Sequence, residues 1–215
     1  MESNCKVSSD IAEVAESVGA PLRLEGRDWF IDDAPAPAMA GAFQRRNAGL
    51  ATEMIRMAGM ADEAAIASGI ASALWPGRLQ LVSPGPLTAL APNARQIWLD
   101  GAHNEAAGAA LCEFFRDHDR RAVHVITGIL ANKDARGLLS HFGAIAERVT
   151  VIPIPGHAHH DPAEIAALAS SLGLESATAK HVEEALAATS AQTVLIAGSL
   201  YLAGEVLRLN EQQPN

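Results

Sequence analysis

The sequence predicts an α/β protein whose main sheet has six mostly parallel strands with helices on both faces. From residue 79 onward, short apolar runs alternate with helical stretches, and this alternation favours parallel strands joined by covering helices. Hydrophobic residues make up 49% of the 215 residues, which is enough to bury a sizeable core. The stretch before residue 75 lacks the alternation, so we expect it to be a smaller, partial α+β fragment.

The N-terminal segment is expected to contain three helices and a hairpin. Ser8, Ser9 and Asp10 can cap the first helix, and Asp62 can cap the third. Two short apolar runs on either side of Glu25-Gly26-Arg27 have the pattern of a hairpin. The expected helices cover residues 11–18, 44–59 and 63–74, the hairpin strands 22–24 and 29–31, and a loop 32–41.

Trp75-Pro76-Gly77 breaks the helical pattern, and we interpret it as an interdomain hinge. We therefore expect two domains, residues 1–74 and residues 75–215. In the second domain the expected strands cover residues 79–82, 97–99, 122–126, 149–152, 175–178 and 193–196. The expected helices cover residues 105–115, 135–142, 162–172, 181–188 and 200–209.

The composition indicates which partners and which compartment to expect. The net charge is -9 and no basic patch stands out, so we expect no nucleic-acid partner. Cys5 and Cys112 lack the spacing of a metal site, which indicates a reducing compartment and inert thiols. The first ten residues are polar and no apolar run could span a membrane, so we expect a soluble, cytoplasmic protein, and we expect it to be a monomer.

The central polar turn follows the apolar run 97–99. Asp100, Gly101, His103 and Asn104 come between that expected strand and the next helix. Ligands of open α/β sheets bind where a strand's carboxyl end meets a helix, and free N–H groups there favour anions. The alternative is that Asp100 caps the helix and His103 is a surface residue of its first turn.

Three further loops follow strand ends and should converge on the same edge of the sheet: residues 127–134, 153–161 and 198–199. Ser199 can bind a carboxylate or can simply cap the last helix. Lys133 and Asp134 can form a plain surface ion pair. The loop 153–161 carries His157, His159 and His160, but its prolines and glycine favour a solvated loop over a metal site, and we expect no metal there.

Two polar residues lie near the hinge. Arg78 follows it directly and can reach a phosphate across an interdomain cleft, or can be a solvated charge at a strand edge. Asn47 lies early in the helix 44–59, where it can cap the helix or contact a base or phosphate.

These segments resemble the folylpolyglutamate synthase/dihydrofolate synthase family, part of the Mur-ligase superfamily. Four motifs occur in the family's order and cover residue 75 to about residue 209. They are Trp75-Pro76-Gly77-Arg78-Leu79-Gln80, Trp98-Leu99-Asp100-Gly101-Ala102-His103-Asn104, Gly128-Ile129-Leu130-Ala131-Asn132-Lys133-Asp134 and Ala197-Gly198-Ser199-Leu200-Tyr201-Leu202-Ala203-Gly204. Upstream, residues 41–48 look like the Gln-x-x-Asn-Ala helix near the end of the family's ATPase domain.

The resemblance implies an ATP-dependent ligase that joins L-glutamate to dihydropteroate or to a folate through an acyl phosphate. Residues 1–74 would be the end of the ATPase domain, and residues 75–215 the Rossmann-like glutamate-ligase domain. By motif position, Asn47, Arg78 and Asp100 match residues that contact ATP. His103 and Ser199 match catalytic-site residues that hold glutamate or complete the cleft, where positioning is a sufficient role. ATP and Mg²⁺ are the implied cofactors.

The sequence departs from the family in one large respect. No G-x-x-x-x-G-K-[ST] loop occurs, and the family's Mg²⁺ ligands and pterin-binding loops are missing as well. We therefore expect the chain to be inactive alone, because phosphoryl transfer needs a phosphate cradle and a metal site. The alternative is a truncated, non-catalytic module that binds nucleotide or glutamate. A peptidoglycan Mur-ligase domain fits less well, because those ligases usually carry Tyr or a similar residue where Gly101 stands.

Overall fold

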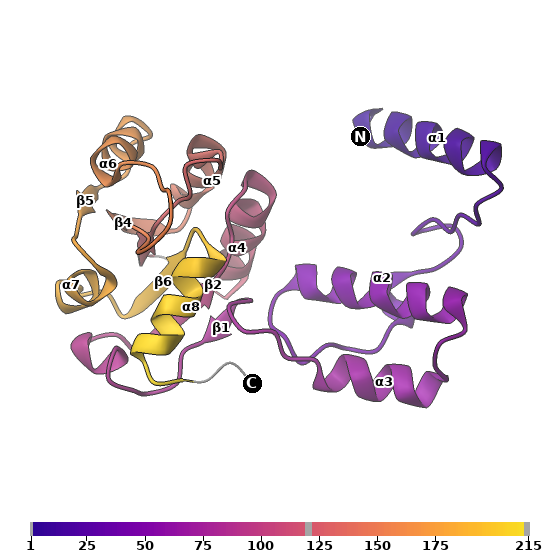
Figure 1. Ribbon diagram of the computed structural model, residues 1–215, viewed down its shortest axis with the longest axis horizontal. Helices are drawn as coiled ribbons and strands as arrows, with labels where there is room; N and C mark the ends of the chain where they lie inside the picture. The colour runs from indigo at the N-terminus through magenta and orange to yellow at the C-terminus, as the bar shows by residue number, and fades with distance from the viewer. Residues whose placement is uncertain (1, 119–121, 213–215) are drawn as a thin grey trace. The chain divides into compact units, whose positions relative to one another are not determined.

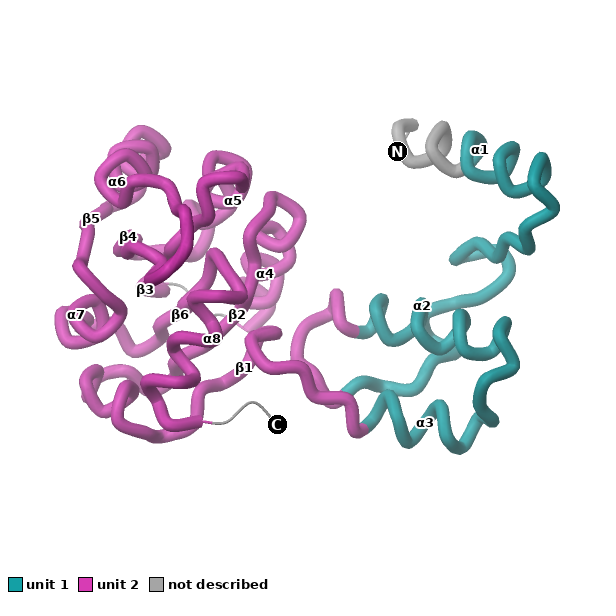
Figure 2. The backbone as a smooth tube through the Cα atoms, viewed as in Figure 1, with its two compact units in different colours: residues 1–37, 45–71 teal, residues 38–44, 72–215 magenta. Residues whose placement is uncertain are grey.

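The computed structural model describes residues 2–118 and 122–212, with side chains from residue 9 onward (Figure 1). The chain divides into two compact units, which Figure 2 colours separately. The first contains residues 1–37 and 45–71, and the second contains residues 38–44 and 72–215. Within the described ranges, no helix is both long and apolar enough to cross a membrane.

The first unit is helical. It contains α1 (Glu2–Ser17), the 3-10 turn η1 (Ile31–Asp33) and most of α2 (Ala42–Ala58) and α3 (Glu63–Ser72). Asp62 caps α3 as predicted, because its Oδ1 accepts the N–H of Ala65 at 2.8 Å. The predicted cap at residues 8–10 is wrong, since α1 begins at Glu2 and these residues lie inside the helix.

The predicted hairpin of residues 22–24 and 29–31 is also wrong. The Asp28 carboxylate accepts the N–H of Leu24 at 2.8 Å, and the N–H of Gly26 donates to the Trp29 carbonyl oxygen at 2.9 Å. These local hydrogen bonds close a turn with only an isolated bridge between Glu25 and Trp29. The apolar runs are too short to compete with such side-chain capping.

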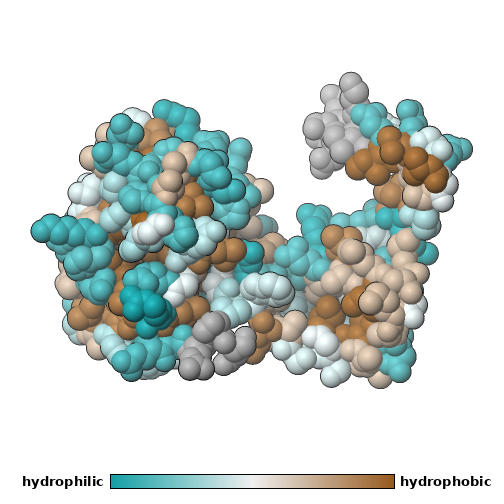
Figure 3. Space-filling view, viewed as in Figure 1, coloured by the Kyte–Doolittle hydropathy of each residue, from teal (hydrophilic) through white to brown (hydrophobic). Residues whose placement is uncertain are grey.

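The first unit buries little apolar surface. Its buried hydrophobic residues, among those described, are Trp29, Ala48 and Ile66. Helices α1 and α2 leave apolar faces exposed, and Figure 3 shows hydrophobic surface on this unit. The exposed residues are Ile11 and Val14 in α1, Val18 directly after it, and Leu50, Met54 and Met57 in α2. This unit is therefore not a complete core by itself.

The second unit contains the predicted six-stranded sheet, in the order β1-β2-β6-β3-β4-β5. The edge strand β1 is antiparallel to β2, and all other neighbours are parallel. The strands are β1 (Gln80–Leu81), β2 (Gln96–Asp100), β3 (Val123–Thr127), β4 (Ala146–Val151), β5 (Ser176–Thr178) and β6 (Thr193–Ala197). Every predicted strand is present, and most boundaries move by one to three residues.

Helices cover both faces of this sheet, as predicted (Figure 1). One hydrophobic cluster joins the sheet to α4 (Glu105–Asp117), α5 (Ala135–Phe142) and α6 (Pro162–Ser171). A second cluster joins the opposite face to α7 (Val182–Ala187), to α8 (Leu200–Leu209) and to Leu87 and Ala91, which flank the 3-10 turn η2 (Thr88–Leu90). Cys112 of α4 is buried, and burial raises the pKa of its thiol to about 11, whereas the Cys5 side chain lies outside the described residues.

His124 lies inside β3 with both ring nitrogens occupied. Nδ1 lies 2.7 Å from the Thr189 hydroxyl oxygen, and Nε2 lies 2.7 Å from the Thr150 hydroxyl oxygen. The residue is 3% exposed. Burial, assisted by the charge of Arg148, lowers the pKa of His124 from 6.5 to about 4. The folded protein therefore holds this imidazole neutral where an unfolded chain would protonate it.

This burial predicts acid sensitivity. Between pH 6.5 and 4 the unfolded chain binds one more proton than the folded one, so the free energy of unfolding should fall as the pH falls. The stabilisation is complete above pH 6.5, and its loss should reach about 3 kcal/mol near pH 4. The free energy of unfolding, measured with urea at several pH values in this range, should fall less steeply with decreasing pH for His124→Gln than for the wild type. His157→Gln, at an exposed position, should keep the wild-type dependence on pH. The same pH dependence in all three proteins would contradict the attribution of the acid sensitivity to His124.

Candidate functional site

The carboxyl ends of four strands lie at one edge of the sheet. Residue pairing aligns Asp100 of β2 with Ala197 of β6, Ala197 with Thr127 of β3, and Thr127 with Val151 of β4. The loops that follow therefore start side by side, as the alternation of strands and helices predicts.

Asp100 joins the central turn to the hinge segment. Its Oδ2 accepts the N–H of Leu79 at 2.7 Å, and its Oδ1 accepts the N–H of Ala102 at 2.7 Å. Burial raises the pKa of this carboxyl above its usual value, while the two N–H donors and the positive charges of Arg78 and His103 oppose that rise. Asp100 is 5% exposed, so its first role is to hold two backbone segments together.

The alternative that Asp100 caps the following helix is wrong. Asn104 is the cap of α4, since its side-chain oxygen accepts the N–H of Ala107 at 2.9 Å. Asp100 ends β2 four residues earlier, where its carboxylate is already occupied by the N–H groups of Leu79 and Ala102.

The hinge segment is a tight turn. The N–H of Gly101 donates to the Gly77 carbonyl oxygen at 2.8 Å, and the N–H of Gly77 donates to Gln80 Oε1 at 2.9 Å. Leu79 has φ of 43°, a conformation that a non-glycine residue adopts only when its surroundings enforce it. The hydrogen bond to Asp100 and burial of the Leu79 side chain provide that enforcement.

Arg78 lies beside the end of β2. Its Nη1 is 3.5 Å from the place where a side chain on Gly101 would begin, and such a side chain would overlap Leu200. In the part of the chain that the structure describes, the Arg78 guanidinium makes no hydrogen bond or ion pair. A partly buried guanidinium whose N–H groups have no acceptor among the described residues suits an anionic ligand at this edge.

His103 has a fixed tautomer. Its Nδ1 lies 2.9 Å from the Gly101 carbonyl oxygen, and because a carbonyl only accepts, Nδ1 carries the proton. Nε2 is then an acceptor, and it has no hydrogen-bond partner among the described residues. In its neutral form the half-buried ring can therefore accept an N–H from a ligand at Nε2.

Ser199 caps α8, which is the second of the two roles that the sequence allows. Its Oγ accepts the N–H of Tyr201 at 3.1 Å, and the residue is 2% exposed. The preceding Gly198 has φ of 127° and packs against Thr127 and the Gly128 carbonyl oxygen, a contact that leaves no room for a Cβ atom. This close approach brings the loops after β3 and β6 together.

The remaining loop residues have structural partners. Asp134 is the cap of α5 and accepts the N–H of Gly137 at 3.1 Å, so the suggested ion pair with Lys133 is replaced by a cap. His160 Nε2 lies 2.9 Å from the Lys133 carbonyl oxygen. His157 stacks on Tyr201, with ring centroids 3.7 Å apart. The loop histidines thus contact different neighbours, and no cluster of metal-ligating side chains occurs among the residues described.

Asn47 belongs to the first unit and lies on the exposed side of α2. The structure brings Arg78, Asp100 and His103 together through Gly101, and it places Ser199 at the neighbouring strand end.

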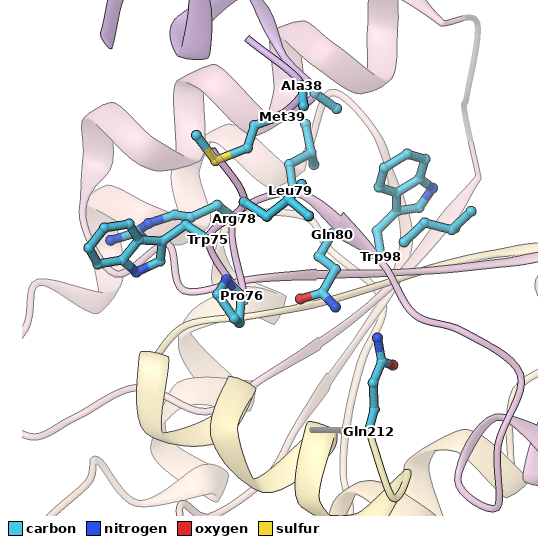
Figure 4. Close-up of a pocket in the computed structure, with 12 residues that line it drawn as sticks. Ala38, Met39, Trp75, Pro76, Arg78, Leu79, Gln80, Trp98 and Gln212 are labelled. Atoms are coloured by element: carbon cyan, nitrogen blue, oxygen red, sulfur yellow. The ribbon is translucent and has the colours of Figure 1, made fainter. Parts of the chain in front are cut away.

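The sequence did not single out the pocket beside β1 (Figure 4). It has a volume of about 340 Å³ and lies within the second unit. Gln80 and Trp98 belong to the quoted motifs, but nothing in their spacing indicates a pocket. The lining residues are Ala38, Met39, Ala40, Leu74, Trp75, Pro76, Arg78, Leu79, Gln80, Leu81, Trp98 and Gln212.

Comparison with known proteins identifies relatives. Residues 86–209 match a family model described as "Dihydrofolate synthetase, C-terminal domain". The chain is 30% identical over 195 residues to a probable bifunctional folylpolyglutamate synthase/dihydropteroate synthase of Halobacterium salinarum, with 86% of this chain and 22% of that protein covered. It is 29% identical over 197 residues to the folylpolyglutamate synthase of Lacticaseibacillus casei, with 87% of this chain and 43% of that protein covered.

The fold has solved counterparts as well. Escherichia coli FolC, in complex with DHPP and ADP, superposes with a TM-score of 0.77 at 25% identity. The match covers 94% of this chain and 50% of FolC. The chain therefore spans half or less of the length of these relatives.

The contact at Gly198 yields a stability prediction. In Gly198→Ala the new Cβ would lie 2.6 Å from Thr127 Oγ1 and overlap the Gly128 carbonyl oxygen, at a φ that alanine disfavours. We expect a loss of about 2 kcal/mol or more in thermal or urea unfolding. Gly204→Ala is the matched control, because that glycine is exposed within α8 with no atom within 4 Å of the new Cβ. It should raise stability by about 0.5–1 kcal/mol, and equal effects of the two changes would contradict the packing described here.

Proposed function

Because this chain belongs to the folylpolyglutamate synthase/dihydrofolate synthase family of ATP-dependent ligases, we propose that it supplies the C-terminal part of such a ligase. The ligase would add L-glutamate to dihydropteroate or to a folate. In this proposal residues 75–215 form the glutamate-ligase domain, and residues 1–74 are the end of the ATPase domain. The observation that carries the proposal is the grouping of Arg78, Asp100 and His103 at the strand ends of a domain that matches this family.

The reaction requires charge stabilisation and positioning. The γ-phosphoryl group of ATP passes to an oxygen of the acceptor carboxylate, and ADP leaves. The amine of glutamate then attacks the acyl carbon, the C–O bond to phosphate breaks, and an amide and inorganic phosphate result. Such a sequence depends on cations that offset phosphate charge and on groups that hold the two substrates in place.

The described residues fit these needs. Arg78 has an unoccupied guanidinium that would offset the phosphate charge of ATP. The Asp100 carboxylate has acceptor capacity beyond its two backbone N–H donors and would receive ribose hydroxyls. Asn47, on the exposed side of α2, is the third proposed ATP contact.

The amino-acid substrate would lie at the neighbouring strand end. His103 presents Nε2 as an acceptor, which suits the ammonium or amine group of glutamate. The Ser199 hydroxyl already accepts the Tyr201 N–H, so it retains its own proton to donate to a carboxylate. Mg²⁺ would stabilise phosphate charge in the complete enzyme, and we propose that its ligands lie outside these 215 residues.

Nucleotide binding tests the role of Arg78. Titration calorimetry with ATP should give a dissociation constant for the Arg78→Ala variant at least tenfold weaker than for the wild type, because a charge-assisted contact is lost. Arg95→Ala is the matched control, since Arg95 is exposed at the amino end of β2, and it should bind like the wild type. Equal affinity of all three proteins, or no heat from any of them, would count against the proposed nucleotide site.

An assay of ADP release tests whether these 215 residues suffice for the ligase reaction. The chain incubated with ATP, Mg²⁺, L-glutamate and dihydropteroate should release no ADP above background, because no G-x-x-x-x-G-K-[ST] motif occurs in its sequence. A coupled assay for ADP measures this. ADP release that depends on dihydropteroate would show that the 215 residues suffice for the reaction.

A further inference from the structure

The pocket beside the edge strand β1 contains two carboxamides whose oxygen atoms are already occupied. Gln80 Oε1 accepts the N–H of Gly77 at 2.9 Å, and Gln212 Oε1 accepts the N–H of Ser83 at 3.3 Å. A backbone N–H can pair only with an acceptor, so these contacts fix which atom of each carboxamide is oxygen. The –NH₂ group of each glutamine therefore points away from the backbone N–H that its oxygen accepts.

The two –NH₂ groups face each other. Figure 4 shows the amide nitrogens of Gln80 and Gln212 turned toward one another from β1 and from the segment after α8. Within the described part of the chain, neither nitrogen has a hydrogen-bond acceptor. Two converging donors to which no described residue offers an acceptor can both donate to a single oxygen atom or carboxylate placed between them.

The surroundings favour an anionic oxygen on an apolar body. No acidic residue is among those that line this pocket. The apolar side chains of Leu79, Leu81 and Trp98 also line the pocket. An indole and two leucines suit a flat ring, and about 340 Å³ accommodates one or two fused rings.

The pocket is preformed. Leu79, with φ of 43°, is held by its hydrogen bond to Asp100, and this sets the direction of the following Gln80. The N–H of Gln212 donates to the Leu207 carbonyl oxygen at 2.9 Å, which anchors Gln212 to the end of α8. Binding would therefore cost little ordering of either glutamine.

We propose that this pocket binds a small aromatic carboxylate, with Gln80 and Gln212 each donating an N–H to the carboxylate and the ring lying against Trp98. Figure 4 shows the Arg78 side chain directed away from the two carboxamides, so this site is separate from the proposed nucleotide contact. The inference does not depend on the proposed ligase function.

The test uses naphthalene-2-carboxylate as the probe and NMR of the purified chain as the measurement. Saturable shifts of glutamine side-chain –NH₂ and tryptophan indole resonances are expected. Gln80→Glu and Gln212→Glu should each weaken binding at least tenfold. Each variant keeps the oxygen that accepts the backbone N–H and replaces the donor with an oxygen that repels the carboxylate.

Two controls make the result decisive. Gln192→Glu adds the same charge at an exposed position outside the pocket and should bind the probe like the wild type. The neutral 2-methylnaphthalene should bind wild type and Gln80→Glu equally. Thermal melting confirms that each variant folds. Absence of saturable shifts, or equal affinity of wild type and both pocket variants, would show that the two carboxamides do not bind the carboxylate, and the proposal would be wrong.

Discussion

The Asp100 carboxylate is the interaction on which the rest of the second unit's functional edge depends. It accepts the N–H of Leu79 from the hinge and the N–H of Ala102 from the central turn, and it does so while almost completely buried. A buried carboxylate is costly unless both oxygens are satisfied, and here backbone donors satisfy them. The arrangement holds Leu79 at a positive φ and sets the positions of Arg78 on one side and Gln80 on the other.

Close backbone contacts complete this edge. Gly101 leaves room for Leu200, and Gly198 leaves room for Thr127 and the Gly128 carbonyl oxygen. A side chain at either glycine would separate neighbouring strand ends and the loops that they carry. The glycines in the motifs therefore determine how tightly the loops pack, while Arg78, His103 and Ser199 provide the polar groups.

Most of the second unit's fold follows from local pattern. Apolar runs such as 193–196 are long enough to form buried strands, and the capping residues Asp134 and Ser199 stand directly before their helices. The first unit was harder to predict. The runs at 22–24 and 29–31 have strand-like composition, but the Asp28 side chain and a tight turn decide their conformation. Local pattern also allows Asp100 to be a helix cap, and it cannot indicate the actual partner Leu79, which is 21 residues away in sequence.

The sequence alone determined the α/β class, the six strands, the motif order and the residues that gather at the strand ends, because strand and helix periodicities and capping are short-range properties. Tertiary structure decided how each polar group is used. It assigned the cap of α4 to Asn104, gave Asp100 to the hinge, paired His157 with Tyr201, and turned the donors of Gln80 and Gln212 toward each other. Each of these outcomes depends on hydrogen bonds or packing between segments far apart in the chain, and no local pattern records them.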